Sequence, residues 1–491
     1  MASNQASESP QEKNDALQTE TPAKDPTLVD FDGPDDPYNP QNMPLWKKWL
    51  LALLLGGITF VVTFASTVFS TATEATAIEY GVSAEVTTLG TSLFVLGFVF
   101  GPVVWGPMSE LYGRKTPLLI GYGIFVVFQI PVAVAQNLAT VIVCRFLGGV
   151  GAAAPPSIVG GYLADFFDPL RRGLAVAIFT TCNFLGPIVG PIIGGFVTSS
   201  HHLGWRWNTW ITMILGAGFG TAGLVLLPET YAPVLLQRKA RRIRYETRNW
   251  AIHAKLGESP VDWKAIVVKY LGRPFIMLVQ EPILFLMTLY TSFIYGFIYL
   301  LFEAYPVSFY NQRGYSLGVS ALPFIAIGIG VIAGSSYIYY VTQTRMKRSF
   351  EHHGKMVPED RLRPMIVGAV LLPIGCFWFA WTSSPHITPW PQIIAGVPLG
   401  AGLQILLLQG LAYIIDVYLI HANSAMSANT IVRSCFGAGF PMFTTAMYQR
   451  LGVNWATSLL GFLAILFLPV PVLFYLFGAR IRRRSRYIPV K

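Results

Sequence analysis

The sequence predicts an all-α membrane protein with twelve transmembrane helices in two pseudo-symmetric six-helix bundles. Three observations lead to this fold class. The chain of 491 residues is 53% hydrophobic and only 12% charged, whereas soluble domains carry about 25% charged residues. Its apolar residues gather in runs near the length of about 20 residues that crosses a bilayer. Six such runs lie on each side of one long polar segment.

The runs and the polar stretches between them divide the chain into five parts. Residues 1–45 are acidic and rich in Pro, Asn and Asp, which predicts a disordered cytosolic tail. Residues 46–228 form the first bundle, and residues 281–479 form the second. A cytosolic loop, 229–280, connects them, and a basic cytosolic tail, 480–491, follows. The expected spans are 47–71, 87–108, 117–137, 139–164, 173–198, 207–228, 282–305, 317–342, 364–382, 389–416, 424–447 and 453–478.

The basic residues indicate how the spans are oriented. With both termini on one side, the loops of that side hold nearly all of the Lys and Arg residues. The opposite loops hold only Arg206, Arg313 and Arg450. Cytosolic loops carry the excess of positive charge, so both termini are expected in the cytosol. The net charge of +10 therefore reflects topology, and we expect no nucleic-acid partner.

The two halves resemble repeats of each other. Placing Asp165 over Asp416, an offset of 416 − 165 = 251, also superposes Gly149 on Gly400 and Gly186 on Gly437. Shared glycines and six spans on each side suggest duplicated bundles. The same offset places Arg145 opposite Gly396, so this charge belongs to the first half alone.

Arg145 lies inside the fourth apolar run. A charge at that depth costs roughly 2.5–3.5 kcal/mol on insertion scales, so it is expected to face a bundle interior or a watery cavity. A guanidinium keeps its proton, which means that it would tune the proton affinity of a nearby carboxylate and not carry the proton itself. The alternative is an arginine that backbone carbonyls hold for packing alone.

The fifth run repeats glycine at helical spacing, with prolines between. Glycine at every fourth position lets another helix approach closely, and proline bends the helix. We therefore expect a bent helix that touches a neighbour tightly. The residues concerned are Gly186, Pro187, Gly190, Pro191, Gly194 and Gly195.

Several of these stretches resemble motifs of the major facilitator superfamily. The segment 106–115, Gly-Pro-Met-Ser-Glu-Leu-Tyr-Gly-Arg-Lys, is similar to motif A, with Glu110 where the family usually has Asp. The segment 145–153 resembles motif B, and 186–195 resembles motif C, the antiporter pattern. The Pro-Glu-Thr-Tyr-Ala-Pro ending of span six, 228–233, and the N-terminal FDGPDDPYNPQN resemble fungal twelve-spanner drug:proton antiporters. The resemblance covers residues 30 to 480.

The resemblance implies roles for individual residues. Glu110 and Arg114 of motif A would form a gate latch, with Glu110 against the start of span eleven near Arg433. Arg145 would influence proton binding or release. Motif C would form the bent contact between the two bundles. At the cytosolic ends of spans four and ten, Asp165 and Asp416 are expected in gate ion pairs or caps.

Further acidic and aromatic residues are candidates for the substrate cavity. Glu303 and Glu74 lie at the outer ends of spans seven and one, as proton or cation sites or as interfacial carboxylates. Span seven also carries three tyrosines at roughly helical spacing, Tyr290, Tyr295 and Tyr299. Aromatic walls suit flat amphipathic ligands and organic cations, although core packing or an interfacial belt explains such residues equally.

These observations predict a proton-coupled antiporter that exports a small amphipathic organic compound by alternating access. The expected cargo is a drug or fungicide, or a fungal secondary metabolite or toxin. The alternative is a proton-coupled importer or a polyamine carrier on the same fold, which would accumulate its substrate in the cell. We expect a monomer in the plasma membrane, whose partners are the substrate, protons and the lipid bilayer.

Catalytic chemistry is not expected. The sequence has no H-E-x-x-H, no G-x-S-x-G and no Walker loop, so uphill transport would draw on the proton gradient and need no cofactor. Two adjacent histidine pairs, His201-His202 and His352-His353, have no third ligand near them in sequence. No metal site is expected.

Overall fold

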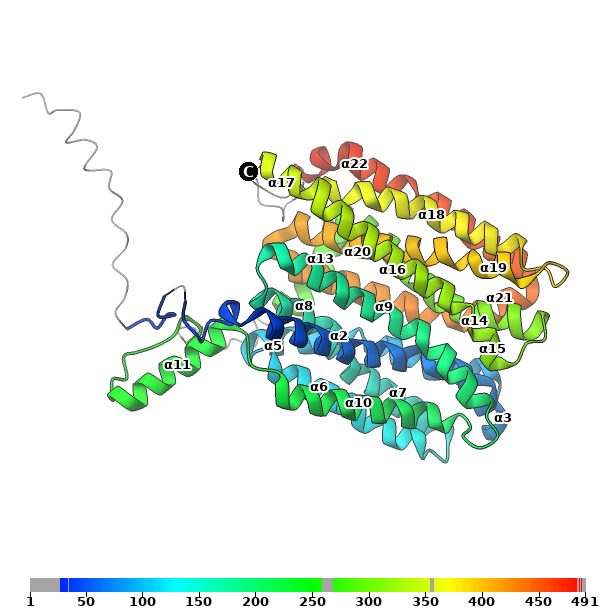
Figure 1. Ribbon diagram of the computed structural model, residues 1–491, viewed down its shortest axis with the longest axis horizontal. Helices are drawn as coiled ribbons and strands as arrows, with labels where there is room; N and C mark the ends of the chain where they lie inside the picture. The colour runs from blue at the N-terminus through cyan, green and yellow to red at the C-terminus, as the bar shows by residue number, and fades with distance from the viewer. Residues whose placement is uncertain are drawn as a thin grey trace, which may run out of the picture. The chain divides into compact units, whose positions relative to one another are not determined.

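The computed structural model describes residues 27–33, 35–257, 268–353, 357–483, 485 and 487. The chain forms two compact units. The large unit consists of Met43–Tyr231 and Asp262–Lys491, and the small unit of Met1–Asn42 and Ala232–Val261. The described residues of the large unit are almost entirely helical, and its helices run side by side in Figure 1.

The first half of the large unit contains six long helical segments. Three of them are interrupted helices, and in two of these a proline lies at the interruption, where it cannot donate to the ladder of hydrogen bonds. The second segment contains a π-helical turn, Gly101–Trp105, that includes Pro102. The elements are α2 (Leu45–Val68), η2 (Phe69–Ala72), α3 (Thr73–Tyr80), α4 (Ala84–Gly97), η3 (Gly101–Trp105), α5 (Gly106–Leu111), α6 (Lys115–Ala133), α7 (Leu138–Ala152), α8 (Ala154–Phe166), α9 (Pro169–Ser199) and α10 (Arg206–Leu226).

The second half begins after a short connecting region and repeats this plan. The connecting elements are η5 (Val268–Gly272) and α13 (Arg273–Gln280). The remaining elements are α14 (Pro282–Pro306), η6 (Val307–Gln312), α15 (Leu317–Ala321), α16 (Phe324–Val341), η7 (Thr342–Met346), α17 (Lys347–His353), η8 (Pro358–Arg361), α18 (Leu362–Trp381), α19 (Pro389–Ile394), α20 (Gly396–Tyr418), η9 (Leu419–His421), α21 (Ala422–Phe467) and α22 (Pro469–Arg482).

Eleven helical stretches of the described chain are long and apolar enough to cross a membrane, and the last contains two crossings. That stretch, Ala422–Arg482, has 61 residues, which would extend about 90 Å as one helix against a hydrocarbon core of about 30 Å. It turns at Gly452, whose φ of 72° and ψ of 163° are not helical. The described residues therefore contain twelve spans, and the predicted fold class is confirmed.

Each half has its own apolar core. In Figure 1 the helices of the first half lie together in the lower part of the large unit, and those of the second half lie above them. The core of the second half also includes Val95 of α4 and Ile188 of α9, so the two halves pack directly on each other.

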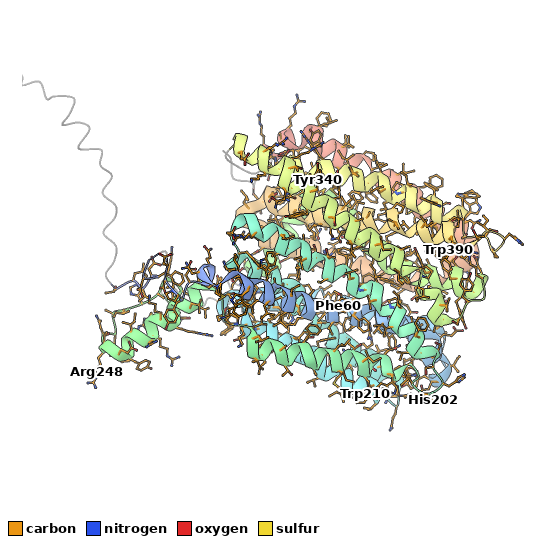
Figure 2. All side chains as sticks on the ribbon, viewed as in Figure 1. Phe60, His202, Trp210, Arg248, Tyr340 and Trp390 are labelled. Carbon is orange, nitrogen blue, oxygen red and sulfur yellow. The ribbon has the colours of Figure 1, made fainter. Side chains whose placement is uncertain are left out.

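Large apolar side chains also cover the outside of the large unit. Tyr340 and Trp390 are 65% and 68% exposed and project from α16 and α19 in Figure 2. An apolar outer surface is what a bilayer-embedded bundle presents, and ring side chains at both ends of the helices match an interfacial aromatic belt.

The two ends of the large unit differ in charge. One end, called the basic end below, carries the turns at Arg114, Arg171 and Arg361. Here Gly113 makes the turn between α5 and α6 with a φ of +91°, a conformation that suits glycine. The N-terminus of α9 is capped at this end by Asp168, which accepts a hydrogen bond from the Arg171 amide.

The small unit corrects part of the expectation for the N-terminal tail. Residues 27–42 were predicted to be disordered, but Leu28 pairs with His253 in an isolated β-bridge. Lys239 of α11 (Ala232–Thr247) contacts Asp32 at 2.7 Å and Asp36 at 3.5 Å. Backbone N–H groups of Asp32 and Tyr38 donate to Asp36 and lower the pKa of its carboxyl. The composition of the N-terminal segment could not predict that it pairs with residues more than two hundred positions later in the chain.

Candidate functional site

Arg145 lies in the interior of the first bundle, only 1% exposed. Its Nε donates to the Gly90 carbonyl at 2.7 Å, and one terminal nitrogen donates to the Ala65 carbonyl at 3.0 Å. The rings of Phe69 and Phe94 cover the guanidinium at 4.6 and 4.7 Å. The side chain thus joins three helices, α2, α4 and α7, and is shielded from the lipid.

The packing of α4 against α7 explains how Arg145 reaches Gly90. A side chain at Gly149 would lie 2.2 Å from the carbonyl oxygen of Phe94, and one at Gly97 would collide with the backbone of Gly149. Glycines at these positions let the two backbones approach closely. Gly90 in turn leaves room for the ring of Phe69, which then stacks on the arginine.

The expected carboxylate partner of Arg145 is not found among the described residues. Its acceptors are two backbone carbonyls, and its second terminal nitrogen, Nη1, is buried without a hydrogen-bond partner. The geometry therefore matches the alternative of an arginine held by carbonyls, with one donor left over. Any influence on a proton would act through the helices that it joins.

A chain of polar side chains continues from this arginine into the second bundle. Ser66, the residue after Ala65, shares a hydrogen bond of 3.1 Å with the Tyr299 hydroxyl. Tyr299 shares another, of 3.3 Å, with Tyr295. The ring of Tyr295 lies 4.8 Å from the guanidinium of Arg433. We call Ser66, Tyr295, Tyr299 and Arg433 the junction residues, since they connect the two bundles.

The junction lies about halfway along the helices. Arg433 is eleven residues after Ala422, the first residue of α21, which is about 16 Å at 1.5 Å per residue. Tyr295 is thirteen residues after Pro282, the first residue of α14, or about 20 Å. In a hydrocarbon core of about 30 Å, both residues lie near the middle.

This placement corrects the position expected for Arg433. The sequence predicted that Glu110 would meet span eleven near Arg433. Instead, Asn423 at the start of α21 donates to Glu110 at 2.8 Å, and Arg433 lies ten residues, about 15 Å, further along the helix. Glu110 does contact span eleven, but at Asn423, and Arg433 takes part in the junction. The prediction was wrong because the family pattern indicates which helix carries Arg433 but not how far along that helix Arg433 lies.

The glycines of α9 form a matched row against α2. A side chain at Gly186 would meet Thr63 at 2.2 Å, one at Gly190 would meet Thr67 at 2.3 Å, and one at Gly194 would meet Thr71 at 2.5 Å. Both rows have a spacing of four residues, so each glycine accommodates one threonine. The Thr67 hydroxyl also donates to the carbonyl of Pro187 at 3.0 Å, a carbonyl whose helical N–H partner would be that of Pro191.

The antiporter-like motif was expected to form the contact between bundles, and its residues divide between two neighbours. Three of its glycines face the first span of the same bundle, whereas Gly195 meets the second bundle, where an added side chain would lie 2.9 Å from the Leu317 carbonyl. Ile188 and Ile192 of the same segment also pack against the core of the second bundle. Outside the motif, Thr181 donates to Ser335 of the second bundle at 2.8 Å.

At the basic end of the first bundle, Arg114 binds Asp165. Arg114 Nε donates to Asp165 at 3.1 Å, with the two side chains 14% and 17% exposed. Thr230 also donates to Asp165. The Arg114 cation lies 4.6 Å from the ring of Tyr231, and burial raises the pKa of that tyrosine, so the ring stays neutral.

Glu229 supports the same region. Its carboxylate accepts the backbone N–H groups of Arg114 and Lys115, at 2.8 and 3.2 Å. These are the first amides of α6, where a negative charge is stabilising. Glu229 also accepts the N–H groups of Thr230 and Tyr231. The segment after span six is thereby tied to the turn between spans two and three.

The second bundle has a corresponding ion pair. Arg361 Nε donates to Asp416 at 2.9 Å, with the side chains 19% and 18% exposed. Arg482 at the end of span twelve binds Glu359 at 2.6 Å. Asp416 is the residue that the internal repeat aligns with Asp165, so both halves close their basic ends with an arginine on this aspartate.

The other candidates for the substrate cavity occupy different surroundings. Glu74 is exposed at the far end of span one. Glu303 is partly exposed and lies one helical turn beyond Tyr299 on α14. Tyr290 is fully buried and stacks on Phe467 at 5.3 Å, which is core packing within the second bundle. Tyr295 and Tyr299 alone among the three tyrosines belong to the junction.

Several residues of the site were missed by the sequence-based reasoning. The threonines of α2 repeat at every fourth residue, the same spacing as the glycines of α9, and this shared period was the available signal. Ser66 and Glu229 had no comparable signal, because their partners are distant in sequence. In the described residues, no group of three or more potential metal ligands gathers, and the side chains of His352 and His353 lie outside the described residues.

Comparisons with known proteins agree with this architecture. Residues 55–434 match the family model described as Major Facilitator Superfamily. The chain is 55% identical to the citrinin biosynthesis cluster MFS transporter of Monascus ruber, covering 95% of this chain and 93% of the relative. It is 45% identical to the cercosporin MFS transporter of Cercospora nicotianae, covering 95% and 90%. Among solved structures, the proton:xylose symporter XylE superposes with a TM-score of 0.64 at 13% identity, covering 88% of this chain and 96% of that one.

Proposed function

Because the chain belongs to the major facilitator superfamily, we propose that it is a proton-coupled antiporter that exports a small amphipathic organic compound. Transport of small molecules across membranes is the general activity of this family. Proton coupling, the direction of transport and the class of cargo form the proposal. The plasma membrane, with both termini in the cytosol, is its proposed location.

The observation that carries the proposal is the polar chain between Arg145 and Arg433. Arg145 holds the backbone of α2 at Ala65, and the next residue, Ser66, hydrogen-bonds to Tyr299 of the other bundle. A charge or polar group at this depth is costly unless it has a function. A change at Arg145 is therefore transmitted to the bundle junction within one residue, which is what coupling between a proton and a substrate requires.

The contacts between bundles support alternating access. One lies at the basic end, where Asn423 donates to Glu110. Another lies at the opposite end, where Gly195 packs on Leu317. The junction lies between them. If each end opens in turn while the other stays closed, a substrate at the junction is exposed first to one side and then to the other.

The relatives support the class of cargo. Their names refer to citrinin, ascochitine and cercosporin, which makes a fungal secondary metabolite the proposed cargo here. The junction itself is aromatic, through Tyr295 and Tyr299, and its charged member is a cation. A polyamine carrier would need a negative charge at this place, so the export of an organic metabolite fits the junction better.

The proposal can be tested with the purified protein in proteoliposomes under an imposed pH gradient. Candidate metabolites and fungicides are offered on the side that corresponds to the cytosol. We expect transport toward the acidic compartment, with protons moving the opposite way, and no transport when the gradient is collapsed. Substrate movement that is indifferent to the gradient would refute antiport, and accumulation in the direction of proton flow would establish an importer.

A further inference from the structure

We propose that Arg433, together with Tyr295 and Tyr299, forms an anion subsite that takes the carboxylate or phenolate of an aromatic organic acid. This inference rests on the proposed function, because it names the class of substrate that would bind at the junction. It assigns the role of substrate binding to a residue that the family resemblance placed in the gate.

Arg433 is a half-buried cation whose Nε has no hydrogen-bond acceptor among the described residues. Its guanidinium stacks on Tyr295 at 4.8 Å, and the Nε atom itself is buried. No described carboxylate forms an ion pair with it. An arginine offers five N–H donors, and leaving the buried Nε unpaired costs free energy. An anionic ligand would offset that cost.

Three other arginines of the large unit have protein acceptors, although Arg145 Nη1, Arg172 Nε and Arg482 Nε are also buried without a partner in the described part of the chain. Arg145 donates to two carbonyls. Arg361 binds Asp416, and Arg313 donates to three carbonyls and to Gln392. Each of these three arginines has at least one acceptor from the protein, whereas the contact that the structure shows for the Arg433 guanidinium is the ring of Tyr295. This difference is consistent with a ligand-binding role for Arg433.

The surroundings of Arg433 favour an aromatic ligand. Gly437, one turn further along α21, lies against Tyr295, because a side chain there would approach its Cε1 to 2.8 Å and Val95 to 3.1 Å. The neighbourhood of Arg433 on α21 therefore includes residues of α4 and α14. The ring of Tyr295 offers a face for stacking.

Glu303, the acidic cavity candidate on α14, does not neutralise the charge of Arg433. Glu303 lies eight residues beyond Tyr295 on the same helix, about 12 Å along its axis, and forms no ion pair with Arg433. A planar guanidinium binds a carboxylate through two parallel hydrogen bonds. The Arg433 guanidinium would repel a positively charged ligand, so the subsite discriminates between ligands by their charge.

The test measures equilibrium binding to the full-length protein in nanodiscs at pH 7.5, without any gradient. The probes are 2-naphthoate and its neutral isostere 2-naphthamide. We expect wild type to bind the carboxylate about tenfold more tightly than the amide. Arg433→Gln should abolish this preference while amide binding remains, and Arg433→Lys, which keeps the charge without the planar fork, should retain part of it. Arg450→Gln, an exposed position on the same long helix, is the matched control and should leave the preference unchanged.

Several outcomes would overturn the subsite. These are equal affinity of wild type for the two probes, no binding of the carboxylate at millimolar concentration, or a preference that survives Arg433→Gln. If Arg433→Gln does not fold, an unchanged preference in both Arg433→Lys and Tyr295→Phe also rejects it. Because the assay has no proton gradient, its result is independent of the antiport test. Anion binding with gradient-insensitive transport would reject the antiport and keep the subsite.

Discussion

At the scale of single residues, two arginines inside the helix bundles differ in how the protein supports their charge: Arg145 is buried and Arg433 is half-buried. Arg145 is held by the carbonyls of Ala65 and Gly90 between two aromatic rings. Arg433 has an aromatic ring beside its guanidinium, and its Nε has no acceptor within the described segments. We interpret the first as a fixed element that joins three helices, and the second as a site that a ligand completes.

The hydroxyl chain between them gives the first prediction. Tyr299→Phe removes both the bond to Ser66 and the bond to Tyr295, whereas Ser66→Ala removes only the first. A hydrogen bond of this kind contributes roughly 0.5–1.5 kcal/mol, so we expect Tyr299→Phe to slow transport about 3- to 10-fold and Ser66→Ala to slow it less.

A double-mutant cycle with initial transport rates checks this prediction. If the two groups act through their shared bond, the double variant should be no slower than Tyr299→Phe alone. Fully additive effects of the two substitutions would show that the bond between bundles has no part in transport.

At the scale of helices, the packing of α9 on α2 is a row of three glycine–threonine contacts. Gly190→Ala should destabilise the protein by roughly 1–3 kcal/mol, because the added methyl group overlaps the Thr67 hydroxyl in a well-packed interface. The measurement is the thermal unfolding midpoint of the purified protein in detergent.

A control variant and a rescue variant test whether the Gly190→Ala destabilisation comes from the close contact with Thr67. Gly173→Ala lies in the same helix with no atom near the added methyl group, and it should leave the midpoint unchanged. Adding Thr67→Ala to Gly190→Ala removes the overlapping hydroxyl and should restore part of the loss. Equal midpoints for Gly190→Ala and Gly173→Ala would contradict the close contact.

The ion pair at the basic end gives a prediction for the helix ends. Asp165→Asn leaves Arg114, which is mostly buried, without its counter-charge, and removing one partner of a buried pair is strongly destabilising. We expect transport to fall about tenfold or more. Asp416→Asn should have a similar effect in the second bundle, because Arg361 has a similar environment.

The control for this prediction is the exposed pair of Arg171 and Asp168, whose side chains are 52% and 45% exposed. Asp168→Asn keeps the helix cap, since asparagine caps as well as aspartate, and exposed ion pairs contribute little. Transport should stay within about twofold of wild type. If Asp168→Asn and Asp165→Asn lost a comparable part of the transport rate, the burial of the ion pair would not be the cause of the loss.

At the scale of the whole molecule, length, apolar runs and basic loops were sufficient to predict twelve spans in two halves. They were sufficient because the bilayer fixes the length of each span, and charge fixes its orientation. The turn at Gly452 lies between predicted spans eleven and twelve, although the helices on its two sides run on almost continuously.

The parts of the site that were not predicted depend on which helices become neighbours. Glycine spacing predicted that α9 would touch another helix, but it did not predict that the partner would be α2 with its threonines. The depth of Arg433 depended on where span eleven begins, and its partner Tyr295 belongs to span seven. Sequence patterns describe one helix at a time, whereas the junction is built from side chains of α2, α14 and α21.

The central claim is that Arg145 couples proton movement to transport through the junction. The most direct measurement compares wild type with Arg145→Gln in proteoliposomes, using both gradient-driven transport and substrate exchange at equal pH. We predict that Arg145→Gln loses at least about tenfold of the gradient-driven rate, or about 1.4 kcal/mol, and retains exchange. Gradient-driven transport at the wild-type rate in Arg145→Gln would contradict the account.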